Sequence, residues 1–540
     1  QTGEVRTISY HETNEWHPTV LHDGRICYSR WDYVDRSAAH FHGLWTSMPD
    51  GTAARALFGN YTMAISACFQ PRAIPGSEKI AFIAGAHHAI VGGSLVLLDP
   101  RKVQLDPHTG EDRFGCLEVL TPEIEFPETP NQWPTGYMVS PWPLDEDRFL
   151  VAFGYDRLPG CGSGNGSEEG TGLYYFDRWG NLELLYREKG WSLLDPVVLA
   201  PRPKPHRWAD PLREHLTTEK GRQWQIGPDE ALVYVYDVRR SLLPLPTGRE
   251  VDHLRIFQLF PKSTPTANDP RIGHANAENA RALLGTAPVE RDGSAFFRVP
   301  ARKPLYFQLV DRQGRAIQGM RTTVYFQPGE QTGCIGCHEP QQQTPPVRMP
   351  LALCREPSAI QPGPPGAKPF NFVQLIQPIL DRHCVRCHAA DADQRPATGA
   401  VGRSTTESGS LQSHTSAAVS RADAPATDRP KKNNLLLTGE PEGHFTKAYH
   451  QLRPYLAFFE WGGASIDQIV TRPGRMGADM SRLSAVLDDP VHRQEVRLSD
   501  QERRTIYLWL DANVPFYGTY DRQLQAAQRR GQDIPLPELQ

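Results

Sequence analysis

The chain has 540 residues, too many for one hydrophobic core, so its length predicts several domains. Its hydrophobic fraction of 39% and charged fraction of 22% are those of a soluble globular protein, and a net charge of −4 without a basic run argues against a nucleic-acid partner. The most apolar stretch, residues 81–98, contains His87 and His88, which a bilayer would bury in hydrocarbon. We therefore expect no transmembrane segment and interpret this stretch as two core strands.

The first half of the chain alternates short apolar runs with turns that contain aspartate or glycine. The paired runs are residues 23–28 with 44–51, 79–83 with 94–100, 148–152 with 173–180, and 231–236 with 254–257. Pairs of strands at irregular spacing are typical of propeller blades with variable loops. The pattern predicts an N-terminal β-propeller over residues 1–265, WD40/TolB-like with six or seven blades, and favours it over a β-sandwich.

A second group of β runs leads directly into the first of two cysteine motifs. These runs are residues 295–299, 305–311 and 323–326. They predict a middle β-rich module over residues 266–350 that carries this motif. The proline-rich residues 351–369 are interpreted as a linker.

The C-terminal part of the chain has a helical period. Apolar residues between 372 and 380 mark one face of a helix that leads into the second cysteine motif. Ser499 and Glu502 form a capping box ahead of a closing helix. We expect a small helical cytochrome c domain over residues 370–540, with a flexible insertion at residues 389–434. The predicted fold class is therefore mainly β with a small α domain.

Two C-x-x-C-H motifs carry the chemical signal of the sequence. They are Cys334-Ile-Gly-Cys337-His338 and Cys384-Val-Arg-Cys387-His388. Two thiols at this spacing each form a thioether with a haem vinyl group, and the adjacent histidine ligates the iron. A zinc ribbon normally has a spacer of about 15–20 residues, whereas 46 residues separate the two pairs here. The motifs therefore predict two covalently bound haem c groups.

Covalent haem attachment predicts an exported protein, because it normally takes place outside the cytoplasmic membrane. We expect a periplasmic or extracellular protein whose signal peptide has already been removed. Five cysteines lie outside the motifs, an odd number whose pairing the sequence leaves open. They are Cys27, Cys68, Cys116, Cys161 and Cys354.

The second iron ligands are less clearly marked than the first. For the haem on His388 the candidates are His492, Met476, Met480, His444 and His450. Near His338 the sequence offers only the poor ligands Gln341, Gln342 and Gln343. That iron is either open to small molecules or capped by a histidine of the N-terminal region, such as His42, His87 or His88.

Motifs in several parts of the chain resemble those of a known family. They are Asn14-Glu-Trp16, His40-Phe-His-Gly-Leu-Trp45, Ala86-His-His88, the Gly333–Pro340 segment, Pro378-Ile-Leu380 and Phe516-Tyr-Gly-Thr-Tyr520. Together with the domain order, they resemble the alpha subunit of hydrazine synthase and related dihaem proteins. The resemblance implies a six-bladed propeller, a catalytic middle haem, and a C-terminal haem with two histidine ligands that passes electrons. The position that matches its second ligand is His492.

Two functions follow from these observations. The family enzyme has a tyrosine ligand four residues after the middle histidine, where this chain has Gln342. This departure favours an electron-transfer cytochrome, with a redox partner protein or other subunits of a complex as partners. The alternative is a redox enzyme that converts a small nitrogen compound at an open haem on His338. A third hypothesis makes the propeller a scaffold for assembling a larger complex.

Overall fold

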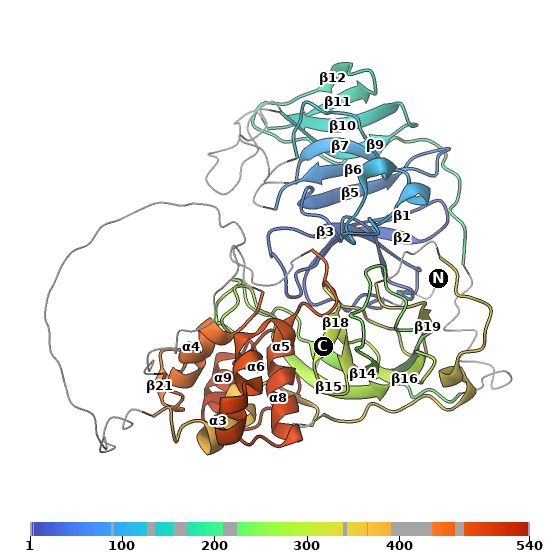
Figure 1. Cartoon of the computed structure of the whole chain (residues 1–540). Coiled ribbons are helices and arrows are strands. Elements are labelled where there is room, and N and C mark those ends of the chain that lie inside the picture. The colour runs from blue at the N-terminus through green and yellow to red at the C-terminus, as the bar shows by residue number, and fades with distance from the viewer. Residues whose placement is uncertain are drawn as a thin grey trace, which may run out of the picture.

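The computed structural model describes residues 3, 5–87, 91–126, 136–154, 170–208, 224–338, 343–363, 366–389, 435–459 and 469–537. Figure 1 shows a stack of β-sheets formed by the N-terminal region, a β module in the middle of the chain, and a group of C-terminal helices beside that module. In the part of the chain that is described, no helix is both long and apolar enough to cross a membrane.

The N-terminal region consists of antiparallel strands that follow one another in sequence. The strands are β1 (Glu15–Val20), β2 (Ile26–Trp31), β3 (His42–Ser47), β4 (Arg55–Phe58), β5 (Ala67–Ala73), β6 (Ile80–Gly85), β7 (Gly93–Leu98), β8 (Leu117–Val119), β9 (Tyr137–Pro143), β10 (Arg148–Gly154), β11 (Gly172–Asp177) and β12 (Leu182–Tyr186). They form three four-stranded groups, β1–β4, β5–β8 and β9–β12. Single residue pairs, His42 with Ala67 and Gly93 with Met138, join one group to the next.

The apolar stretch at residues 81–98 forms two core strands, β6 and β7, as the sequence predicts. Both faces of these strands are buried. Ala81 and Leu95 contribute to one hydrophobic cluster, whereas Phe82 and Val96 contribute to another. A sheet with neighbours on both faces needs apolar residues at consecutive positions, which explains why this stretch lacks the usual alternation.

Of the expected propeller, the structure shows the antiparallel strands. The described strands follow an open path from β1 to β12, and they do not close into a ring. The predicted fourth pair, residues 231–236 with 254–257, is wrong. Strand β13 (Glu230–Val235) pairs with β16 and β19, whereas β14 (Val251–Leu259) pairs with β15 and β17. Both runs are buried and apolar, so their pattern alone could not identify their partners.

The middle module contains two sheets. Besides β13 and β14, these sheets contain β15 (Arg281–Pro288), β16 (Ala295–Pro300), β17 (Leu305–Asp311), β18 (Ala316–Gly319), β19 (Gln331–Cys334) and β20 (Lys368–Pro369). One sheet has the order β16-β13-β19 and the other β18-β17-β14-β15-β20. The proline-rich segment runs along these sheets, because Ser358 bridges to Phe297 and Gln361 bridges to Thr286.

The C-terminal part is helical. Its helices are α2 (Phe372–Leu375), α3 (Gln377–His383), α4 (Lys447–Leu452), α5 (Gly477–Met480), α6 (Arg482–Asp488), α7 (Pro490–Glu495), α8 (Asp500–Asp511) and α9 (Arg522–Arg529). The predicted helix before Cys384 is confirmed as α2 and α3, and the predicted capping box of Ser499 and Glu502 begins α8. The expected insertion at residues 389–434 lies, except for Ala389, outside the described residues.

Asp511, at the end of α8, connects the helices to the middle sheet. Its Oδ2 accepts hydrogen bonds from Arg255 Nη1 (3.1 Å) on β14 and from the Ala316 backbone N–H (2.8 Å) on β18. Its Oδ1 accepts one from the N–H of Ala478 (2.8 Å) on α5. Burial raises the pKa of Asp511 to about 6, although Arg255 and the backbone donors oppose this. One carboxylate therefore holds four elements together.

We predict that Asp511→Ala lowers the free energy of unfolding by about 3–5 kcal/mol, because it leaves the guanidinium of Arg255 buried without its partner. Chemical denaturation followed by circular dichroism measures this change. Asp229→Ala is the control: its carboxylate forms an exposed ion pair with Arg302, and such pairs contribute about 0–1 kcal/mol. Equal losses from the two variants would contradict this role of Asp511.

Candidate haem sites

The first motif lies at the end of β19, and the segment that follows β13 holds its backbone. Strands β13 and β19 are parallel, with Val235 opposite Cys334. The carbonyl of Cys334 accepts from the N–H of Tyr236, and the N–H of Cys337 donates to the carbonyl of Arg240, both at 2.9 Å. The carbonyl of His338 accepts from the N–H of Leu242, also at 2.9 Å. The turn is thus fixed on both sides of its cysteines.

Glycine is required within this turn because the chain approaches so closely. A Cβ at Gly336 would lie 2.0 Å from the carbonyl oxygen of Arg240. The C-x-x-C-H pattern does not indicate this requirement, because it leaves both residues between the cysteines unspecified. Cys334 itself is exposed, whereas Cys337 is partly buried and packs against the hydrophobic core of the middle module.

The ring of His338 contacts the N-terminal region. Its ring packs edge-on against Tyr61, with the ring centroids 4.9 Å apart and the planes at 74°. Its Nε2 atom is buried and forms no hydrogen bond. That atom lies beside Gly110 of the N-terminal region, which in turn adjoins Val470 of the C-terminal part. Burial lowers the pKa of His338 to about 4, against the opposing effect of the Gly110 backbone.

The surroundings of His338 fit a metal-ligating imidazole. The lowered pKa keeps the ring neutral at pH 7, which is the form that binds iron. A buried ring nitrogen without a hydrogen bond is unfavourable unless another group binds it. The two cysteines and the histidine of the first motif are the residue types that a haem c requires, whereas the Nε2 atom itself is enclosed by the protein beside Gly110.

Glu330 connects the strand of the first motif to the N-terminal region. Its carboxylate accepts hydrogen bonds from the N–H groups of Ala53 (3.0 Å) and Gln327 (2.8 Å). Burial raises the pKa of Glu330 to about 7, in spite of these donors. The folded chain favours the protonated carboxyl of Glu330. The stability that this carboxyl contributes is therefore complete below about pH 4.5 and is lost as the pH rises through 7.

We predict that Glu330→Gln removes this part of the pH dependence, because the amide resembles the protonated carboxyl. Between pH 5 and 8 the wild-type free energy of unfolding should fall relative to that of the variant. Denaturant titrations at several pH values test this expectation. Glu356→Gln makes the same change at an exposed position and should leave the wild-type pH profile intact. Identical pH profiles for Glu330→Gln and Glu356→Gln would contradict the role of Glu330 in the pH dependence of stability.

The second motif begins where α3 ends. Cys384 caps this helix through its N–H, which donates to the carbonyl of Leu380 (2.7 Å). The N–H of His388 donates to the carbonyl of Cys384 (3.0 Å), and the carbonyl of His388 accepts from Leu437 (2.9 Å). Burial raises the pKa of the Cys384 thiol to about 11. Helix, turn and the Leu437 segment together fix the histidine of this motif.

His492 interacts electrostatically with His388, although about a hundred residues separate them. Burial lowers the pKa of His388, the Leu435 backbone opposes this, and the electrostatic interaction with His492 lowers it further. His492 lies on the short helix α7, whose N-cap Asp489 accepts from its N–H. Arg386, between the motif's cysteines, pairs with Glu495 of the same helix (3.5 Å). The motif therefore holds the helix that carries the expected second ligand.

The other candidate ligands of the second haem lie in different surroundings. Met476 is buried, with its methyl group near Gly319 of β18, and Met480 packs against Ala457 and Phe459. Nε2 of His450 is 3.2 Å from the carbonyl oxygen of Glu442. The carbonyl of His444 accepts from the hydroxyl of Tyr517 (2.5 Å). These contacts explain each residue as part of the fold, and among the candidates only His492 has a described interaction with His388.

The histidines of the N-terminal region form an aromatic cluster. His42 stacks on Trp31, with centroids 5.2 Å apart, and its Nε2 is 3.2 Å from Nδ1 of His87. Burial, together with His87, lowers the pKa of His42 to about 3. The structure thus places Tyr61 and Gly110, not His42, beside His338. His88 lies outside the described residues, as do Gln341 and Gln342.

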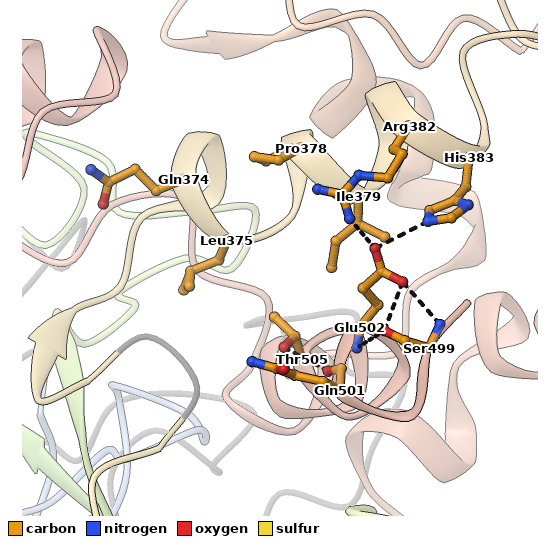
Figure 2. A pocket seen from close by; sticks show the side chains of 10 residues that line it. All are labelled: Gln374, Leu375, Pro378, Ile379, Arg382, His383, Ser499, Gln501, Glu502 and Thr505. Atoms are coloured by element: carbon orange, nitrogen blue, oxygen red, sulfur yellow. Dashed lines mark hydrogen bonds and ion pairs between the residues drawn. The ribbon is translucent and has the colours of Figure 1, made fainter. Parts of the chain in front are cut away.

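A surface cleft of about 530 Å³ lies where α3 meets the start of α8. Figure 2 shows Glu502 at its centre, bonded to Arg382, His383 and Ser499. Burial raises the pKa of Glu502, but the hydrogen bonds from Ser499 and His383 outweigh it and lower the pKa to about 2. This carboxylate fixes α8 against the helix that ends at the second motif.

Another buried cluster, which the sequence analysis missed, lies between the N-terminal region and the middle module. Among the described residues, His11, Glu12 and Asp32 form the one group of three or more histidine, cysteine or carboxylate side chains whose potential metal-ligating atoms all lie within 4.8 Å of one another. The guanidinium groups of Arg30 and Arg36 each lie 3.6 Å from Asp32. Two carboxylates beside two guanidiniums are already balanced in charge, so we interpret this cluster as an ion-paired network of the fold.

The remaining cysteines are mostly structural. Cys27, Cys68 and Cys116 are buried thiols of one hydrophobic cluster. Cys354 is an exposed thiol, and Cys161 lies outside the described residues. Burial raises the pKa of all three clustered thiols, which keeps them protonated and unreactive.

Comparison with known proteins points to one family. Residues 249–339 match the hydrazine synthase alpha subunit middle domain. The hydrazine synthase subunit alpha of Kuenenia stuttgartiensis is 22% identical over 388 residues, which are 62% of this chain and 42% of that relative. The solved structure of Kuenenia stuttgartiensis hydrazine synthase matches with a TM-score of 0.62 at 17% identity, and the match covers 95% of this chain and 70% of that one.

These similarities confirm the family resemblance predicted from the motifs. The sequence match places the middle domain at β14–β19, the strands that precede and include the first cysteine of the first motif. The structural match extends the common fold over nearly the whole chain. This chain spans less than half the length of the curated relative that it matches.

Proposed function

We propose that this hydrazine synthase alpha-like chain is an exported dihaem c-type cytochrome that transfers electrons. The observation that supports the proposal is the electrostatic interaction of His492 with His388, together with the ion pair of Arg386 and Glu495 that connects the second motif to the helix of His492. Two histidine ligands saturate an iron and suit electron transfer rather than substrate binding.

Each haem would be held by residues of its own motif. Cys334 and Cys337 would form the thioethers of the first haem, with His338 as its iron ligand. Cys384 and Cys387 would hold the second, with His388 and His492 as ligands. When bound, the groups supply one-electron chemistry at iron. The chain's own residues set the ligands, bury His338, and fix the turn and helix that carry each motif.

The place of action and the partners belong to the same proposal. Covalent haem attachment supports a periplasmic or extracellular location. A redox partner protein, or other subunits of a complex, would receive or supply the electrons; the match to a hydrazine synthase subunit supports such an assembly. We also propose a propeller-like N-terminal region, which the three four-stranded antiparallel groups support.

One observation favours a second candidate function, a hydrazine synthase-like conversion of a small nitrogen compound at the haem of His338. The sequence directly after His338 offers only glutamines, at positions 341–343, which are poor iron ligands. An iron there with an open coordination position would bind small molecules. The matches to hydrazine synthase support this alternative as well.

Two attached haems are expected in the mature protein. Mass spectrometry of the denatured chain should show the added mass of two porphyrins. Replacing Cys334 and Cys337 together by alanine should remove one of them, and replacing Cys387 and Cys384 should remove the other. Cys354→Ala, at an exposed cysteine outside the motifs, should keep both. A chain without added porphyrin mass would exclude the proposal.

The ligand role of His492 is tested by spectroscopy. His492→Ala should convert one of the two haems from a low-spin to a high-spin absorption spectrum, because its iron loses one axial ligand. His450→Ala, at a half-buried histidine on α4 that packs against Phe445, should leave the spectrum unchanged. If the spectrum of His492→Ala is unchanged and Met480→Ala instead converts one haem from low spin to high spin, the second ligand is a methionine.

Carbon monoxide distinguishes the two candidate functions. The reduced electron-transfer protein has no vacant ligand position and should not bind carbon monoxide. The enzyme alternative predicts binding at one haem, the one on His338, which persists in His492→Met but disappears when Cys334 and Cys337 are replaced.

A further inference from the structure

We infer that the outer end of the N-terminal region binds a second copy of this chain through strand β12. The surface consists of Leu184, Leu185 and Tyr186 on β12 together with Trp191, and we call it the β12 patch. Figure 1 shows β12 at the end of the sheet stack farthest from the middle module and the helices. The inference therefore goes beyond the proposed function and does not rest on it.

Exposed apolar side chains are concentrated in one part of the chain. Among the described residues, sixteen large hydrophobic side chains are exposed, and nine of them lie between residues 179 and 208. Single exposed apolar residues are normal in folded proteins, whereas a group of them marks an interaction surface. The four residues of the β12 patch are between 53% and 65% exposed. Together they offer roughly 400–500 Å² of surface, which is large for a patch on a single chain.

The first end of the sheet stack is covered by the middle module. The outer face of β1–β4 carries Tyr28 and Trp45, which belong to one small hydrophobic cluster. The hydroxyl of Tyr28 lies 3.5 Å from that of Tyr325, and Nη2 of Arg30 donates to the carbonyl of Thr323 (2.6 Å). This end of the stack therefore has its partner within the chain.

The other end of the stack, formed by β9–β12, is covered on one face only. Its inner face packs against β5–β8 in one hydrophobic cluster that includes Phe149 and Tyr174. Its outer face carries Leu150 and Leu173, which are only half-buried. Strand β12 has no buried residue, whereas its counterpart β4 in the first group has two. This end of the stack lacks the neighbour that the first end has.

The backbone around the β12 patch is well fixed, so its exposure does not come from a loosely held segment. Strand β12 pairs with β11, with Tyr186 opposite Leu173. Beyond β12, the N–H of Leu193 donates to the carbonyl of Thr171 (3.0 Å), and the Thr171 hydroxyl donates to the carbonyl of Leu193 (2.8 Å). The N–H of Trp191 donates to the carbonyl of Glu188 (3.2 Å). The patch is thus a preformed apolar surface.

Strand β12 also has a free edge. It is the last strand of its sheet, and within the described part of the chain no strand pairs with its outer edge. Natural proteins usually protect such an edge with lysine, proline or a covering segment. The sequence of β12, Leu-Glu-Leu-Leu-Tyr, contains neither lysine nor proline. A two-fold axis pairs such an edge with its own copy in the antiparallel direction.

The charges on either side of the patch favour a second copy as the occupant. Glu183 precedes the apolar residues and Lys189 follows them; both are exposed, and in the described structure neither side chain forms an ion pair or a hydrogen bond. Arg187 and Glu188 already bond to tyrosine hydroxyls of the same copy. Antiparallel pairing brings Glu183 of each copy toward Lys189 of the other, and cross-strand pairs of opposite charge are stabilising.

The area of the patch suits a dimer that associates reversibly. Two β12 patches would together remove roughly 800–1,000 Å² from water, and the paired backbone adds to this area. Weakly associating proteins bury less than about 1,200 Å² in their interfaces. We therefore expect association that depends on protein concentration in the micromolar range.

Sedimentation velocity of the full chain, from low to high micromolar concentration, tests the inference. Wild type should shift from monomer to dimer. Leu185→Lys should raise the dissociation constant by about tenfold or more, because it places two ammonium groups in the apolar interface. Val20→Lys is the matched control, since Val20 on β1 is 52% exposed and Leu185 53%; it should dimerise like wild type. Wild type that remains monomeric, or a dimer that Leu185→Lys leaves intact, would overturn the inference, whatever other protein binds the patch.

Reversing the charges tests the antiparallel arrangement. Glu183→Lys should weaken the dimer, because the new lysine faces Lys189 of the second copy. Adding Lys189→Glu to this variant should restore wild-type association. Equal dissociation constants for Glu183→Lys and wild type would overturn the arrangement. Both positions are exposed, so these variants decide the inference should Leu185→Lys fail to fold, as judged by circular dichroism.

Discussion

The first site depends on one atom, the buried Nε2 of His338, which forms no hydrogen bond. Leaving such an atom unsatisfied costs about 1–3 kcal/mol, and a fold that keeps it buried requires a compensating interaction. The backbone bonds from Arg240 and Leu242 hold the motif in a position where His338 cannot turn back to solvent. A metal bond at Nε2 would supply the missing interaction, and the lowered pKa of His338 leaves the ring neutral for that purpose.

Three parts of the chain meet at Gly110, beside this atom. The middle module supplies His338, the N-terminal region supplies Gly110, and the C-terminal part supplies Val470. Glu330 joins the first two of these regions through the N–H of Ala53. Asp511 joins the helices to the middle sheet. Two buried carboxylates, distant from both motifs, thus stabilise the geometry on which the site depends.

The sequence predicted features that depend on local order. Cysteine spacing identified both motifs, alternation and apolar runs identified the strands, and Ser499 identified the start of a helix. It did not predict which strands pair, because β13 and β14 look alike as isolated runs and the residues they pair with lie between 22 (Leu259 with Arg281) and 99 (Leu232 with Gln331) positions away. Tyr61 and Gly110 were missed for the same reason. Nothing near either residue in the sequence shows that His338 folds against it.

His492 could be proposed as a ligand only with the help of the family resemblance. Its local pattern, a histidine on a short helix, would fit any exposed position, and only the family resemblance singled it out. In the structure, His492 interacts electrostatically with His388, and the Arg386–Glu495 ion pair connects α7 to the second motif.

The two motifs differ in how much of the chain they need. His388 and His492 both belong to the C-terminal helical part, so the second site is formed within one region. The first site is enclosed by three regions, and its histidine faces Gly110 rather than another ligand. The surroundings of His338 therefore depend on the relative positions of several regions, whereas those of His388 depend mainly on the packing of the C-terminal helices.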